Sequence, residues 1–109
     1  MTAKLFLLQR LSAAFLAFAV AIHLATILYA SRHGLTAGDI LSRTQGNVIL
    51  CVFYSLFVVA VAVHAPIGLR NVVREWLGWR GRATDGALFL FALLLLGLGF
   101  RAVTAVFLG

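Results

Sequence analysis

Three long apolar stretches, separated by two short polar segments, constrain this chain more than any other feature of its sequence. A helix crosses the hydrocarbon core of a bilayer with roughly 20 residues, and each stretch is long enough to do so. The stretches cover residues 5–30, 47–70 and 85–108, and the segments between them are rich in Gly, Ser, Thr and Arg, as loops are. The pattern predicts three transmembrane helices in a single membrane-anchor domain, residues 1–109.

The composition excludes other fold classes. Of the 109 residues, 63% are apolar and only 11% are Asp, Glu, Lys or Arg, whereas soluble domains carry about 25% charged residues. In lipid, only helices or a closed barrel satisfy every backbone polar group. Barrel strands alternate polar and apolar residues over about ten positions, and these stretches do not alternate. An all-α membrane protein is therefore expected.

The basic residues predict the orientation of the helices. Because cytoplasmic segments are enriched in Lys and Arg, we expect the N-terminus and the second connection in the cytoplasm and the C-terminus outside. The net charge of +6 is therefore a topology signal, and nucleic-acid binding is not expected. Six basic residues fall on the inner side, namely Lys4, Arg10, Arg70, Arg74, Arg80 and Arg82, and two on the outer side, Arg32 and Arg43.

The first stretch is expected to stay in the mature chain. A secretory signal has an apolar region of about 7 to 15 residues followed by a small-residue cleavage motif, whereas this stretch is longer and ends in Tyr29, Ala30, Ser31 and Arg32. The single cysteine, Cys51, lies in the second stretch, so no internal disulfide can form.

Three ionisable residues lie inside the stretches: His23, His64 and Arg101. Ionisable groups in lipid are costly, so they mark candidate functional sites. One helical turn before and after His64 lie Ala60 and Gly68, which leave shallow hollows where a flat macrocycle would fit. Alternatively, these small residues serve close packing and His64 is hydrogen-bonded to a neighbouring helix.

His23 allows the same two interpretations, a heme ligand or a hydrogen-bonded structural histidine. It differs from His64 in depth. At about 1.5 Å per residue, His23 lies roughly 18 Å from the inner membrane edge and His64 about 6 to 9 Å from it. An offset on the order of 10 Å prevents the two from sharing one heme, so each needs a partner histidine from elsewhere.

Arginines at the ends of the stretches also have two interpretations. Arg10 lies at the inner entrance of the first stretch, two residues before Ser12. Its guanidinium would reach lipid headgroups or donate to a heme propionate or a quinone carbonyl. Arg101, near the outer end of the third stretch, has the same alternatives, and contact with headgroups is favoured.

Two segments resemble a known family, the cytochrome b membrane anchor subunits of succinate dehydrogenase and fumarate reductase, which are respiratory complex II. Residues 8–23, LQRLSAAFLAFAVAIH, are similar to the family's first-helix motif of a basic residue, then Ser and a small residue, then an apolar helix. Residues 64–75, HAPIGLRNVVRE, are similar to its pattern H-x-x-x-G-[IL]-R followed by an acidic residue. The match covers two of the three expected helices.

The resemblance implies a role for each matched residue. His64 corresponds to the second-helix axial ligand of an inner heme b. Arg10 and Ser12 correspond to residues at a quinone or a heme propionate, and Arg70 to one at a heme propionate or at the interface with the iron–sulfur subunit. Family members with two hemes have a first-helix histidine, so His23 would ligate an outer heme b. The opposite ligands would come from a second anchor chain, similar or identical to this one.

The resemblance thus implies the non-catalytic anchor of a succinate:quinone oxidoreductase of the tricarboxylic acid cycle and electron transport, surrounded by lipid in a bacterial inner membrane. A flavoprotein and an iron–sulfur subunit would dock on its cytoplasmic face and pass electrons to quinone. Two other functions stay open: a heme-free quinone-binding anchor, and a small transporter or pore protein. A pore would need a polar stripe along the third helix, which shows only Arg101 and Thr104.

Overall fold

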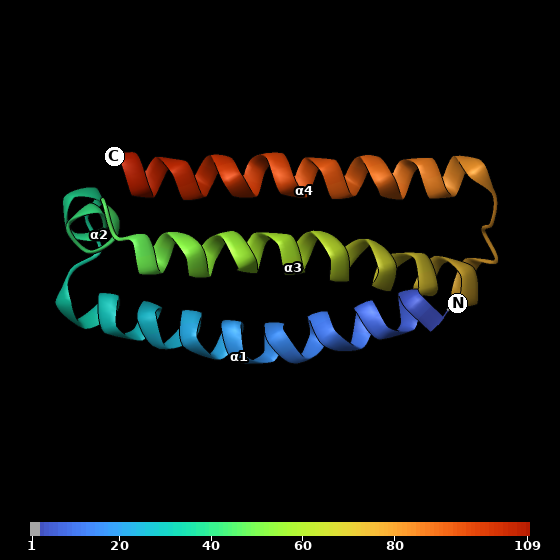
Figure 1. Ribbon diagram of the computed structural model, residues 1–109, viewed down its shortest axis with the longest axis horizontal. Helices are drawn as coiled ribbons and strands as arrows, with labels where there is room; N and C mark the ends of the chain where they lie inside the picture. Colours follow the sequence, from blue (N-terminus) through green and yellow to red (C-terminus); the bar gives the residue numbers. More distant parts are fainter. Residues whose placement is uncertain (1–2) are drawn as a thin grey trace.

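The computed structural model describes residues 3–109 and consists of three long helices and two short helical segments (Figure 1). The long helices are α1 (Ala3–His33), α3 (Val48–Val72) and α4 (Arg82–Leu108). A short helix, α2 (Ala37–Thr44), lies between α1 and α3, and a π-helical turn, η1 (Val73–Leu77), extends α3. The described residues contain no strand.

All three long helices are long and apolar enough to cross a membrane by length and composition, which confirms the three predicted spanning helices. Their bounds differ from the prediction, most of all in the second, which runs from Val48 to Leu77 and not to residue 70. Neither Gly nor Pro interrupts the chain between Leu69 and Leu77. The helix ends where Gly78 adopts a left-handed conformation, with φ of 69°, as is common at helix C-termini.

The first connection was expected to be a loop, but it contains α2. Its N-terminus is a capping box: the Thr36 hydroxyl accepts from the Asp39 N–H at 3.1 Å, and the Asp39 carboxylate accepts from the Thr36 N–H at 3.3 Å. Hydrogen bonds from the Thr36 side chain and then its backbone lower the pKa of Asp39 below its ordinary 3.8. Because the folded pKa is the lower one, the cap is at full strength above pH about 4 and weakens as the pH falls through the folded pKa.

The helices form an antiparallel bundle with α3 between α1 and α4 (Figure 1). The beginning of α1 and the connection from α3 to α4 lie at one end, here called the N-terminal end. The other end, called the α2 end, holds α2 and the C-terminus. The bundle measures 47 × 23 × 22 Å, and its long dimension is close to the roughly 40–45 Å thickness of a bilayer with its headgroups.

The α2 end is tied to the last turn of α4. Thr44 Oγ1 donates to the Val106 carbonyl at 2.9 Å, Gln45 Nε2 donates to the Leu108 carbonyl at 3.1 Å, and the Gly46 N–H donates to the Phe107 carbonyl at 2.9 Å. These carbonyls have no partner within their own helix.

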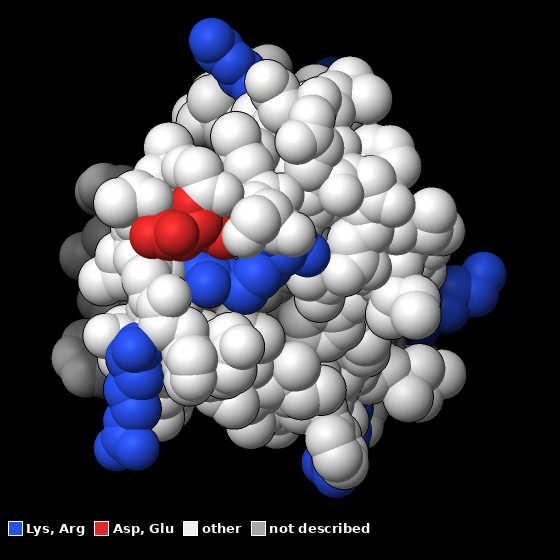
Figure 2. Space-filling view, turned by 90° about the vertical axis from the view of Figure 1, so that its left-hand side faces the viewer, with Lys and Arg blue, Asp and Glu red and all other residues white. Residues whose placement is uncertain are grey.

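Figure 2 views this end, where acidic atoms lie directly against basic ones and further basic side chains project from the rim.

Few side chains are buried within the single chain. The buried residues include the small Ala19 and Ala62, each on a helix that contacts another, while most large apolar side chains face outward. An outward apolar surface is the expected arrangement when lipid is the solvent, because helix association then depends on close contact between small residues.

Gly99 allows such a close contact between α4 and α3. A Cβ placed on Gly99 would lie 2.5 Å from Cγ1 of Val58 and 2.8 Å from Cγ2, whereas a Cβ on Gly97 would meet nothing within 4 Å. We expect Gly99→Ala to destabilise the protein by about 1–3 kcal/mol relative to Gly97→Ala, through overpacking. Reversible unfolding in detergent measures the difference. Since both substitutions gain the same helix propensity, equal stabilities for the two variants would contradict the packing argument.

Candidate functional site

The histidine site nearer the N-terminal end joins α3 to α1. His64 Nδ1 lies 3.3 Å from Ser12 Oγ, and the Ser12 hydroxyl donates to the Gln9 carbonyl at 3.1 Å. Ser12 is buried, with 8% of its surface exposed. Because the single proton of the serine hydroxyl is used on Gln9, Oγ accepts from His64. We therefore assign the His64 proton to Nδ1, which leaves Nε2 with a free lone pair.

The second histidine site joins the same helices nearer the α2 end. His23 Nδ1 lies 3.1 Å from the Tyr54 hydroxyl, which is also 3.4 Å from Thr26 Oγ1. The Thr26 hydroxyl donates to the His23 carbonyl at 2.6 Å, so Tyr54 donates to Thr26 and accepts from His23. We assign this proton to Nδ1 as well, and Nε2 of His23 is again left with a free lone pair.

The two sites lie at different depths. Tyr54 and His64 are about ten residues apart on α3, which separates the sites by roughly 15 Å along the helix. This is somewhat larger than the offset expected from the sequence, because side-chain contacts between α1 and α3, and not the ends of the apolar stretches, set the register of the two helices. The single chain therefore brings one histidine to each depth.

Two open grooves adjoin His23. One, of about 520 Å³, is bounded by α1, α2 and α3 and includes Arg43 in its lining. The other, of about 340 Å³, reaches across α3 to Gly99 and Val103 of α4. Both are lined by His23 and Tyr54. The imidazole also packs edge-on against Tyr54, with ring centres 5.5 Å apart.

The surroundings of His64 are tighter. A Cβ on Gly68 would lie 3.3 Å from Nε2 of Gln9, so the Gln9 side chain occupies the hollow expected on that side of the imidazole. Oε1 of Gln9 is buried without a hydrogen-bond partner among the described residues. Pro66, two residues after His64, lines a separate groove of about 450 Å³ that His64 does not line.

Arg10 and Ser12, which the resemblance assigns to a quinone or a heme propionate, lie on different sides of α1. Arg10 is on the exposed side of α1, where its guanidinium carbon lies 5.6 Å from the centre of the Phe6 ring. Ser12 faces α3 and is engaged with His64. Arg101 is exposed on α4, and a long arginine side chain in such a position can reach headgroups.

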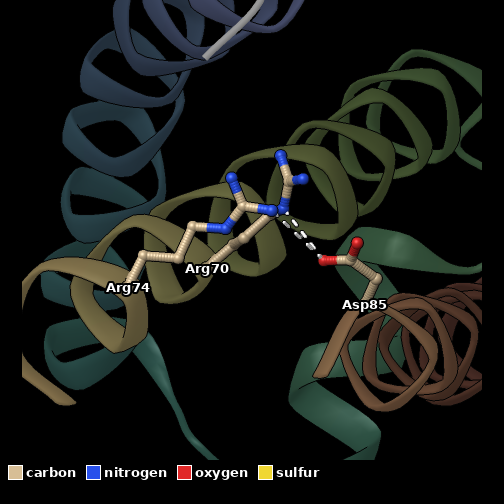
Figure 3. Close-up of polar contacts among 3 residues, drawn as sticks. All are labelled: Arg70, Arg74 and Asp85. Atoms are coloured by element: carbon tan, nitrogen blue, oxygen red, sulfur yellow. Dashed lines mark hydrogen bonds and ion pairs between the residues drawn. The ribbon is translucent and has the colours of Figure 1, made fainter. Parts of the chain in front are cut away.

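Arg70 is paired with an acidic residue, Asp85, that the sequence pattern did not predict as its partner. Its Nε donates to Asp85 Oδ1 at 3.1 Å, and Arg74 Nη2 lies 3.9 Å from the same oxygen (Figure 3). The contact ties the end of α3 to the first turn of α4. A polar pocket of about 280 Å³ at this end is lined by Arg70, Asn71, Arg74, Glu75 and Arg80.

The donor set suits a heme better than a bare metal ion. The described residues contain no group of three or more His, Cys, Asp or Glu side chains that could hold an ion. A heme brings its own four nitrogen ligands and needs only axial side chains, and an imidazole with a free Nε2 is such a ligand. Each imidazole thus has the donor atom that axial ligation of a heme requires.

A comparison of the chain with protein-family models, with curated proteins and with solved structures found no significant match.

Proposed function

We propose that this chain is the membrane anchor and the heme b and quinone-binding subunit of a succinate:quinone oxidoreductase, a succinate dehydrogenase or fumarate reductase of a bacterial inner membrane. One observation carries the proposal. The two segments that resemble the anchor family, residues 8–23 and 64–75, meet through Ser12 and His64, whose side-chain atoms lie 3.3 Å apart. Residues that match one family's motifs on two helices thus form one site.

Each histidine has a separate part in this function. His64 would hold an inner heme b through Nε2, and His23 would hold an outer heme b. A second anchor chain, similar or identical, would supply the remaining ligands, because one chain offers a single histidine at each depth. When bound, heme b supplies reversible one-electron chemistry, and the apolar helices around it hold the low-dielectric surroundings that influence its potential.

The N-terminal end carries the docking and quinone functions. Arg10, exposed on α1 near this end, donates to the quinone or to a heme propionate, as a planar guanidinium does well. The polar pocket at Arg70 and Glu75 faces the iron–sulfur subunit, behind which the flavoprotein sits. The Asp85 carboxylate holds the Arg70 guanidinium in place, so this surface is oriented before the partner arrives. With this end in the cytoplasm, the C-terminus lies outside.

Purification of the tagged chain from its native membrane tests the proposal. We expect flavoprotein and iron–sulfur subunits in the preparation, together with succinate-dependent reduction of a quinone. A chain that purifies without a flavoprotein would contradict the proposal and favour a transporter or pore.

A heme-free quinone-binding anchor is the second candidate function. The observation in its favour is that both imidazoles already have a hydrogen-bond partner within the chain, as structural histidines do. The two candidates differ in the absorption spectrum of the purified complex, because only the heme-binding anchor shows a b-type band.

A further inference from the structure

The two histidine sites have a reciprocal construction. At the inner site α3 provides the histidine and α1 the hydroxyl; at the outer site α1 provides the histidine and α3 the hydroxyl. We propose that Ser12 and Tyr54 are positioning residues. Ser12 holds His64, and Tyr54 holds His23, with the proton on Nδ1 and the lone pair on Nε2. Each of these two residues thereby sets the redox potential of one heme independently of the other heme. This inference rests on the proposed function.

The environment of Ser12 argues for this role and against direct contact with a quinone. Its side chain is buried between α1 and α3, and its only proton is committed to the Gln9 carbonyl. The oxygen is left as an acceptor, and the nearest described donor is His64 Nδ1. A quinone carbonyl requires a donor, so Ser12 in this arrangement serves the histidine.

Tyr54 acts on both the proton and the orientation of His23. Its hydroxyl accepts from Nδ1, and the Thr26 hydroxyl, engaged with the His23 carbonyl, fixes the direction of the phenolic proton. The rings of Tyr54 and His23 are nearly perpendicular, at 86°, and Phe57 packs on the imidazole with ring centres 5.7 Å apart. The imidazole is therefore held from two sides, with Nε2 on the edge away from the phenol.

The expected effect on potential follows from charge donation. A hydrogen bond from Nδ1 to an oxygen raises the basicity of the ligating nitrogen, and such partners commonly change metal affinity by about 10- to 100-fold when removed. A more basic axial ligand stabilises the ferric state, so loss of the acceptor shifts the midpoint potential upward. Since the sites are roughly 15 Å apart along the helices, each shift is confined to one heme.

Redox titration of the purified complex, followed through the b-type band, tests the inference. We expect Tyr54→Phe to raise the midpoint potential of one heme component and Ser12→Ala to raise that of the other. Matched controls are Tyr29→Phe, at the other tyrosine of the chain, and Ser31→Ala, whose hydroxyl also donates to a carbonyl three residues back but is exposed. Both controls are expected to titrate as the unaltered complex.

The outcomes separate this inference from the function on which it rests. If the Ser12→Ala complex loses a heme, a Ser12→Thr complex is expected to retain that heme with an unshifted midpoint potential, because threonine restores the acceptor oxygen. Loss of the heme in both variants would overturn the role of Ser12. Unchanged potentials in Tyr54→Phe and Ser12→Ala, or a shift of both hemes together in either variant, would overturn the inference while leaving heme binding intact. Full heme content after replacement of both His23 and His64 would instead overturn the proposed function.

Discussion

Replacement of His64 by alanine is expected to remove the inner heme and with it about half of the b-type absorbance of the purified complex. The imidazole is the only ligating group that the chain is proposed to offer at this depth, and its Nε2 has a free lone pair because Nδ1 is bonded to Ser12. Alanine leaves the iron without that axial ligand. The heme content per complex, measured from the reduced-minus-oxidised spectrum, gives the result.

Two further variants make this experiment specific. His33→Ala removes a histidine that is exposed and bonded to the Tyr29 carbonyl at 2.9 Å, so full heme content is expected. His64→Met keeps an axial ligand but loses the bond to Ser12, and since thioether ligation raises the potential of a b-type heme, a retained heme with a raised potential is expected. Full heme content in His64→Ala would contradict the assignment of His64.

Replacement of His23 by alanine is expected to remove the outer heme while the inner one stays. The sites are separated by roughly 15 Å along α1 and α3, and His23 is bonded to Tyr54, not to any residue of the inner site. About half of the b-type absorbance should again be lost, and the remaining component should keep the potential of the heme at His64. The double variant should show no b-type band.

The outcome of the His23 experiment also counts the hemes. If His23→Ala retains the whole band, the chain serves one heme and the outer site is structural, as its bond to Tyr54 would also allow. If either single variant loses the entire band while the partner subunits still co-purify, the sites are not independent and the separation by depth is wrong.

The sequence was sufficient for the large elements because membrane-spanning helices are specified by length and hydropathy alone. The apolar stretches predicted α1, α3 and α4 closely. The short helix α2 was not predicted, although the sequence contains a capping signal for it, Thr36 followed three residues later by Asp39. The extension of α3 to Leu77 was not predicted because the apolar stretch ends at the basic residue Arg70, although basic residues are common in the last turns of a helix.

The side-chain contacts of the candidate site were less accessible from the sequence. His23, His64 and Ser12 were identified as candidates, but the bond between Ser12 and His64 depends on how α1 and α3 are rotated about their axes. In lipid the outer face of a helix is as apolar as its inner face, so periodicity does not reveal that rotation. For the same reason Tyr54 was missed, although a tyrosine in mid-span needs a partner for its hydroxyl.

The polar contacts at the N-terminal end show the same limit. Asp85 was placed at the start of the third stretch, but its contact with Arg70 depends on how α3 and α4 pack, since the two residues are 15 positions apart. Arg10 and Ser12 are close in sequence, yet on a helix two residues at this spacing point in nearly opposite directions. Their side chains therefore meet different surroundings: Arg10 lies on the exposed side of α1, and Ser12 faces α3.

The reduced-minus-oxidised spectrum of the complex purified through this chain, with heme counted against subunits, tests the central claim most directly. The account predicts a b-type band and two hemes for each pair of anchor chains, in a complex that contains a flavoprotein and an iron–sulfur subunit. A complex with those partners but no b-type band would contradict it, and would leave His23 and His64 as structural residues of a heme-free anchor.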